Sequence, residues 1–206
     1  MSQHRARAEF PVAEIPAADA VRLMKTMLIP RPIAWVGTRS AAGVDNLAPH
    51  SFFTMVSNEP PMLVFASSGR KDTLANIEET GQFTVSIVDG ALADAANRTS
   101  APYGPEVDEF AAAGLEKEAG AAVVPRRVAG SPAVFECELE RVVEAGDGFT
   151  VFGRVVHLAV AEDVLVTDER GHRLPDARRL DPVTRLGRNE WGTLGGVVER
   201  DRPSAG

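Results

Sequence analysis

The apolar positions of this chain mostly follow the two-residue period of strands, with a few stretches at the helical period. The first helical stretch covers residues 17–27, where one stripe carries Ala20, Val21, Met24 and Met27 or Leu28. Pro16 suits the first position of such a helix because its missing N–H costs nothing there. Ile33 to Thr38 then predicts a strand, and the turn residues 40–43 predict a hairpin with the run that follows.

The middle of the chain is predicted to form two strands with different burial. Met62 to Ala66 is a continuous apolar run, which predicts a strand buried on both faces. Further along, Phe83, Val85 and Ile87 alternate with hydroxyl residues, which predicts a half-buried strand.

A helix is predicted between these two strands. Asp72 or Thr73 can cap its start, Leu74 and Ile77 face inward, and Gly81 ends it. Two shorter helices are expected at residues 91–98 and 107–113.

The clearest hairpin comes late in the chain. From Val134 to Val143, apolar residues alternate with three glutamates, and the turn 145–148 leads into a returning strand at 149–160. Strands outnumber helices and hairpins dominate, so an antiparallel barrel or sandwich with helical insertions is favoured over a parallel sheet. The chain shows no internal repeat, and we expect one domain.

Composition and charge narrow the function classes. Hydrophobic residues make up 44% and charged residues 25%, as in ordinary globular proteins, and the formal net charge is -7. This charge argues against a nucleic-acid binder but leaves room for a small phosphorylated ligand held by a local cluster of donors. Cys137 is the only cysteine, so we expect a buried structural thiol and no intramolecular disulfide.

Several kinds of site are not expected because their patterns are missing. The chain contains no GxGxxG, GxxxxGK[ST], HExxH or GxSxG pattern, and its four histidines lack ligand spacing, so we expect no metal site. No stretch approaches the length of a membrane span and residues 1–10 contain no apolar run, so we expect a cytoplasmic protein without membrane contacts.

Two segments are hard to explain by folding alone. Residues 46–54 read Asn-Leu-Ala-Pro-His-Ser-Phe-Phe-Thr, where polar side chains and a proline interrupt what would otherwise be a strand. We expect an irregular backbone there, with unpaired N–H and C=O groups aimed at a planar ligand. The alternative is an Asn/Pro turn followed by core phenylalanines.

The second segment, residues 67–73, reads Ser-Ser-Gly-Arg-Lys-Asp-Thr and lies between a buried strand and a helix N-terminus. Hydroxyls, two cations and free amide N–H groups converge where the helix dipole is positive, which favours an anion such as phosphate. The alternative is a solvated loop with a helix cap.

Four short motifs follow one another along the chain: Arg31-Pro32-Ile33-Ala34, Asn46-Leu47-Ala48-Pro49-His50-Ser51-Phe52-Phe53, Asn58-Glu59-Pro60-Pro61 and Lys71-Asp72-Thr73-Leu74. In this order they resemble the flavin reductase-like family of FMN-binding split barrels. More narrowly, the chain resembles the flavoprotein oxygenase branch that contains the nitrilotriacetate monooxygenase reductase component. The match runs from about Pro30 through Trp191. It implies a mainly β fold, an antiparallel Greek-key split β-barrel with short helical insertions, and a homodimer with FMN near the subunit interface.

The same resemblance implies which residues bind the cofactor. The isoalloxazine ring and ribityl chain would contact Asn46, Leu47, Ala48, Pro49 and Ser51. The phosphate end would be held by Ser67, Ser68, Lys71, Asp72 and Thr73. Residues 180–191 resemble the family's closing motif and would bring Asn189 and Trp191 beside the flavin, with a structural tryptophan at the barrel or dimer seam as the alternative.

No catalytic residue follows from the motifs. His50, inside the flavin segment, and His157, on the strand 153–157, are the candidates, and a satisfied structural histidine is the alternative for each. The absence of a triad or paired carboxylates agrees with a cofactor that carries the chemistry itself.

The resemblance implies transfer of hydride from NAD(P)H to flavin, with a monooxygenase as the partner that receives reduced FMN. Two other functions stay open: a flavin-binding electron carrier without nicotinamide activity, and a flavoprotein oxygenase acting directly on a small molecule. We expect an N-terminal extension with a short helix at 1–29, the split barrel at 30–195 and a polar tail at 196–206.

Overall fold

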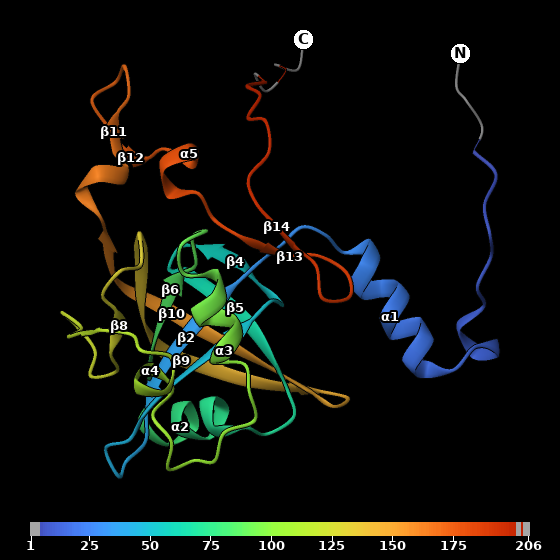
Figure 1. Ribbon diagram of the computed structural model, residues 1–206, viewed down its shortest axis with the longest axis horizontal. Coiled ribbons are helices and arrows are strands. Elements are labelled where there is room, and N and C mark those ends of the chain that lie inside the picture. The colour runs from blue at the N-terminus through green and yellow to red at the C-terminus, as the bar shows by residue number, and fades with distance from the viewer. Residues whose placement is uncertain (1–4, 201–202, 204–206) are drawn as a thin grey trace.

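The computed structural model describes residues 5–200 and residue 203 of the chain. Its centre is a seven-stranded antiparallel sheet with the strand order β3-β2-β6-β9-β10-β5-β4 (Figure 1). The strands are β2 (Ala34–Arg39), β3 (Asp45–His50), β4 (Phe53–Asn58), β5 (Pro61–Ser68), β6 (Gln82–Ile87), β9 (Ala133–Ala145) and β10 (Gly148–Val160). The sheet curls until β3, at one end, contacts β5 near the other. The predicted mainly β split barrel is therefore confirmed.

The remaining elements surround this barrel. The helices are η1 (Val12–Glu14), α1 (Ala17–Met27), α2 (Asp72–Thr80), α3 (Ala93–Arg98), α4 (Glu109–Ala112), η2 (Glu162–Val164) and α5 (Ala177–Leu180). The short strands are β1 (Arg31–Pro32), β7 (Lys117–Glu118), β8 (Arg127–Val128), β11 (Leu165–Thr167), β12 (Arg173–Pro175), β13 (Thr184–Arg185) and β14 (Trp191–Gly192). The helix predicted at 17–27 is confirmed, and those expected at 91–98 and 107–113 are present but shorter. Much of the expected tail lies outside the described residues.

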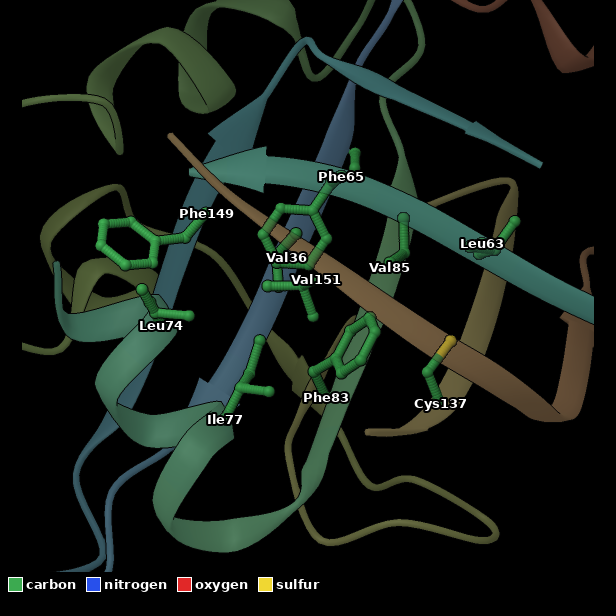
Figure 2. Packing of buried hydrophobic residues seen from close by; sticks show 11 residues of the cluster. Val36, Leu63, Phe65, Leu74, Ile77, Phe83, Val85, Cys137, Phe149 and Val151 are labelled. Carbon is green, nitrogen blue, oxygen red and sulfur yellow. The ribbon is translucent and has the colours of Figure 1, made fainter. Parts of the chain in front are cut away.

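The barrel interior is packed with aliphatic and aromatic side chains from the main sheet and from α2 (Figure 2). Leu74 and Ile77 of α2 point into it and are fully buried, as predicted. Gly81 ends α2 in the left-handed region at φ 72°, which a glycine adopts without strain.

The predicted cap of α2 is wrong. Lys71 occupies the N-cap position with extended backbone and makes no side-chain cap bond, while Asp72 is the first helical residue. The Thr73 hydroxyl instead donates to Asn46 Oδ1 at 3.0 Å, because a tertiary acceptor lies within its reach.

A second core cluster lies on the outer face of β2 and β3, beneath α3 and α4. It contains Trp35, Leu47 and Phe110, all fully buried. Trp35 Nε1 donates to the Thr99 hydroxyl at 2.9 Å, which attaches the segment after α3 to the barrel.

The predicted burial of β5 and β6 is wrong for both strands. In β6 the hydroxyl residues are as buried as the apolar ones, because β6 lies between β2 and β9 and its outer face is covered. Thr84 Oγ1 donates to the Arg126 carbonyl at 2.7 Å, and Ser86 Oγ accepts the Val128 N–H at 3.3 Å. In β5 only alternate residues are buried, so Met62 and Val64 are partly exposed.

The late hairpin β9–β10 is confirmed. One of its alternating glutamates, Glu136, does not face solvent. This carboxylate is fully buried and accepts the N–H groups of Ala121, Ala122 and Val123 at 2.8, 2.6 and 3.0 Å. Arg127 Nε adds a further bond at 2.8 Å. Burial by itself would raise the pKa of Glu136, but these donors outweigh it and hold the pKa below its usual value.

Cys137 is a buried free thiol, as predicted. Burial raises its pKa, and the neighbouring Glu136 carboxylate adds to that shift. In the part of the chain that the structure describes, no helix has the length and apolar character needed to cross a membrane.

Candidate functional site

A cleft of about 870 Å³ opens where the two ends of the curled sheet meet, between β3 and β5. Its walls come from seven parts of the chain: α1, Arg31 of β1, β3 with the bend after it, the end of β5 with the start of α2, residues 99–105, Glu109 of α4 and residues 185–188. Its volume falls within the range typical of small-molecule sites.

The wall formed by β3 is more regular than the sequence predicts. Residues 45–50 pair with β2 without interruption, so the irregular backbone expected there is wrong, and only Ser51 and Phe52 form a bend. The Leu47 N–H donates to Glu109 and so points away from β2. Pro49, two residues further on, has the same orientation on this edge strand, and its missing N–H leaves the ladder intact.

The alternative of core phenylalanines after β3 holds for only one residue. Phe53 packs against the barrel core, whereas Phe52 is 40% exposed and lines the cleft.

Asn46 joins the two segments that the sequence singled out. Its Oδ1 atom accepts the Thr38 hydroxyl at 3.1 Å and the Thr73 hydroxyl at 3.0 Å. Thr38 in turn accepts a bond from Asn76 Nδ2 at 3.0 Å. This buried network orients the Asn46 amide and fixes the edge of β3 against the first turn of α2.

The start of α2 carries cations with different partners. Arg70 forms an ion pair with Glu78 and lies over the Phe149 ring at 4.9 Å. Lys71 is exposed, lines the cleft and makes no capping bond to the helix. Among the described residues Lys71 forms no ion pair, so its ammonium can meet a ligand at this end of the cleft.

Glu109, at the start of α4, is a cleft residue that the sequence analysis missed. It is 5% exposed, and its Oε2 atom accepts the Leu47 N–H at 3.0 Å. Burial raises the pKa of Glu109; the Leu47 N–H opposes this shift, and the Asp72 charge adds to it. Its partner is 62 residues away in the chain, so no local pattern could have indicated its role.

Arg31 is a second missed residue, although it belongs to a motif noted in the sequence. Its guanidinium donates to the carbonyls of Leu28 and Leu186, both at 2.8 Å, and Nε lies 3.5 Å from Ser51 Oγ. It also lies over the Phe52 ring at 5.8 Å. Burial lowers its pKa, and nearby Arg185 adds to the effect. Arg31 thus fastens α1 and the C-terminal segment to the cleft.

The cleft is strongly cationic in a chain whose net charge is -7. Two acidic side chains, Asp72 and Glu109, line it. The basic side chains that line it are Arg22, Lys25, Arg31, Arg70, Lys71, Arg185 and Arg188. This local excess of positive charge favours an anionic ligand. Among the described residues, no group of three or more potential metal ligands is brought together.

A family model for the flavin reductase like domain matches residues 24–174. This chain belongs to the flavin reductase-like family. It is 36% identical over 205 residues to the protein YwrF of Bacillus subtilis, covering 95% of this chain and 98% of the relative. It is also 33% identical over 123 residues to the 4-hydroxyphenylacetate 3-monooxygenase reductase component of Thermus thermophilus, covering 59% of this chain and 73% of the relative.

Among solved structures, the flavin reductase-like chain is similar to nitrilotriacetate monooxygenase component B from Bacillus cereus. The TM-score is 0.87 at 31% identity, with 96% of this chain and 100% of that chain covered. The resemblance to this branch of the family is therefore confirmed.

Most of the residues predicted to bind the cofactor line the cleft of this flavin reductase-like protein. They are Asn46, Ala48, Pro49, Ser51, Ser67, Ser68, Lys71, Asp72 and Thr73. The Leu47 side chain lies in the second core cluster instead, and its backbone is what faces the cleft wall at Glu109. Asn189 and Trp191 line an adjoining hollow with Asn97, and Arg185 borders both cavities.

The two candidate histidines lie in different places. His50 lines the cleft, and its ring centroid is 4.7 Å from that of Phe65. Burial lowers the pKa of His50 to about 4; a hydrogen bond with the Ala66 backbone opposes this, and the Lys71 charge adds to it. His157 lies in an apolar hollow on β4, β5 and β10, with Met62 and Leu158.

Proposed function

We propose that this chain binds FMN and reduces it with hydride from NAD(P)H, and that it supplies reduced FMN to a partner monooxygenase. One observation carries the proposal. The edge of β3 and the start of α2 line the same cationic cleft, and the hydrogen bond between Asn46 and Thr73 joins them. The similarity to a monooxygenase reductase component supports the partner. We also propose a cytoplasmic location and place the barrel at residues 30–195, with an extension before it and a tail after it.

The residues of the cleft fit FMN. A phosphate would meet Lys71, the exposed Ser68 and the N–H groups at the uncapped start of α2. The Ser67 and Thr73 hydroxyls already donate to the Gly69 carbonyl and to Asn46, so they contribute less than their position in the motif implies. The ring system would lie toward Ala48, Pro49 and Ser51, which line the cleft along the β3 edge.

The hydride-accepting chemistry is supplied by FMN when it is bound. The residues of the chain itself bind the cofactor and orient it. The Asn46 network holds the β3 edge in one position. The Arg31 guanidinium, fixed by three backbone carbonyls, places a permanent positive charge in the cleft wall. Such a charge stabilises negative charge that develops on a ligand during reduction.

Apolar surface that one chain leaves exposed supports a homodimer. On α1, Val21, Met24 and Met27 are 46%, 53% and 69% exposed, although they form the stripe that the sequence predicts to be covered. The apolar hollow that contains His157, about 450 Å³ in volume, is a second such surface, and the exposed Met55 and Leu158 line it. Apolar patches of this kind mark association surfaces. Light scattering should give a dimer, and a monomer with FMN bound would contradict this part of the proposal.

Flavin titration and nicotinamide oxidation together test the function. We expect one FMN per subunit, preferred over riboflavin, and steady-state oxidation of NADH or NADPH when FMN is present. Tight FMN binding without nicotinamide oxidation would favour the electron-carrier alternative. A chain that binds neither flavin would refute the proposal.

A further inference from the structure

The floor of the cleft contains a buried nitrogen that has no hydrogen-bond partner. Nε2 of His50 is enclosed, and among the residues that the structure describes it is the one buried side-chain nitrogen or oxygen without a partner. The residue as a whole is partly exposed and lines the cleft, so the imidazole stands at the boundary between the cleft and the barrel interior. Buried polar atoms are nearly always satisfied, and an exception calls for a functional explanation.

The position of the His50 ring is fixed by its neighbours. His50 is the last residue of β3 and pairs with Ala34 of β2. Its ring spans the split of the barrel and packs on Phe65 of β5, with 4.7 Å between centroids and 50° between planes. The ring therefore cannot turn toward solvent without opening this contact.

His50 is neutral above about pH 4. Its strand neighbours Ala34, Phe65 and Ala66 carry no charge. Lys71 is the charged group that acts on the ring, and it disfavours the cationic form. A hydrogen bond with the Ala66 backbone opposes this effect of burial and of Lys71. A neutral imidazole with one nitrogen donating presents the second nitrogen as an acceptor.

We propose that His50 Nε2 accepts a hydrogen bond from the riboflavin part of the bound flavin. This inference rests on the proposed function, since it needs a flavin in the cleft. Donors on that part are the ribityl hydroxyls and the N3–H of the ring, whereas a phosphate dianion only accepts. His50 thus binds the portion that FMN and riboflavin share, and Lys71 binds the portion that FMN alone carries.

Two substitutions distinguish the contribution of the Nε2 acceptor to flavin binding from that of the packing of the ring. His50→Phe keeps an aromatic ring against Phe65 and removes the acceptor, whereas His50→Gln restores an acceptor at a similar reach. One neutral hydrogen bond corresponds to roughly a threefold to tenfold change in affinity. We expect His50→Phe to weaken FMN and riboflavin by the same factor in that range, and His50→Gln to recover most of the loss.

Apo stability distinguishes this contact from a structural role. His50→Phe removes the unpartnered Nε2 and also the hydrogen bond with the Ala66 backbone, and these two changes oppose each other, so the Tm of the apo protein should shift by less than about 2 °C while flavin binding weakens. A histidine that acted only on the fold would lower the Tm and would leave the flavin affinity of the folded protein unchanged. Lys71→Ala is the matched variant in the same cleft, and it should weaken FMN alone.

The pH dependence of riboflavin binding gives an independent measurement, since riboflavin has no phosphate to titrate. Wild-type affinity should fall as the pH drops from 6 toward 4, because protonation removes the acceptor, and the affinity of His50→Phe should stay level. Equal flavin affinity in wild type and His50→Phe within twofold would overturn the inference and leave the proposed function standing. A loss of FMN affinity without loss of riboflavin affinity would overturn it too. Failure of the wild type to bind any flavin would instead remove the proposed function.

Discussion

The two buried glutamates of this protein occupy contrasting surroundings. Glu136 lies on β9 and is fully buried, and three backbone N–H groups and Arg127 saturate its carboxylate. Glu109 lies in the cleft wall, almost as buried, and accepts the N–H of Leu47. The pKa is lowered at Glu136 and raised at Glu109. The same residue type is thus held charged in one region and pushed toward neutrality in the other.

The surroundings of the two glutamates differ because one region stabilises the fold and the other has groups available to a ligand. Around Glu136 the chain supplies every donor, so the buried charge is compensated internally. Around the cleft, Lys71 makes no capping bond and His50 Nε2 has no partner among the described residues. Polar groups in the cleft are therefore available for hydrogen bonds to a ligand, whereas those around Glu136 are paired within the chain.

The largest effect is expected at Glu136. Glu136→Ala leaves Arg127 buried without its main partner and three N–H groups unpaired. The free energy of unfolding should fall by about 3–5 kcal/mol, as measured by urea denaturation. Glu138→Ala is the matched control, two residues along the same strand, because its ion pair with Arg154 is exposed. Glu138→Ala should lower the free energy of unfolding by less than about 1 kcal/mol. Equal losses of stability in both variants would contradict the difference proposed between the two glutamates.

The next effect concerns binding rather than stability. Lys71→Ala removes a charged donor from the proposed phosphate end and should weaken FMN about tenfold to a hundredfold, equivalent to roughly 1.5–3 kcal/mol. Riboflavin affinity should hardly change, and the apo protein should lose about 0.5 kcal/mol or less. Arg70→Ala is the control, since Arg70 is engaged with Glu78. If Lys71→Ala stays within twofold of wild type, Arg70 and Ser68 become the better phosphate ligands.

A smaller effect is expected in the pH dependence of apo stability. The pKa of His50 is lowered to about 4 in the folded state, so the unfolded chain binds a proton first as the pH falls below about 6.5. Wild-type stability should therefore decline between pH 6.5 and 4.5, by about 1–2 kcal/mol from this residue. Denaturation of wild type and His50→Phe across this range measures it. Parallel curves for the two proteins would show that His50 is not held neutral.

The smallest effect is expected at Glu109. Its raised pKa means that the folded state disfavours the charge, so ionisation costs stability as the pH rises through the unfolded value of about 4.3. Glu109→Gln keeps an acceptor for the Leu47 N–H and should change the free energy of unfolding at pH 7 by less than about 1 kcal/mol. The same substitution at Glu136 should be clearly more costly, and a reversed order would contradict the comparison.

Local patterns in the sequence determined most of the elements of this fold. The hairpin around residues 40–43, the hairpin β9–β10, and the inward residues Leu74 and Ile77 follow from periods of two and 3.6 residues and from turn residues. These features depend on neighbours within a few positions, which the sequence displays directly. The motifs at residues 46–53 and 71–74 likewise indicated the two segments that line the cleft.

Burial and the completed site were decided only by tertiary structure. β6 is buried on both faces because the segment around Arg126 and Val128 covers its outer face, whereas β5 buries only alternate residues, although their sequences predict the reverse. Glu109 reaches Leu47 across 62 residues, and Arg31 reaches Leu186 across 155. The sequence presents residue types and spacings, whereas the pKa of a carboxyl and the partner of a buried nitrogen depend on what the folded chain packs around them. For that reason the sequence predicted a flavin site that included His50 and Lys71, and only the structure showed that Glu109 shares the walls of one cleft with them.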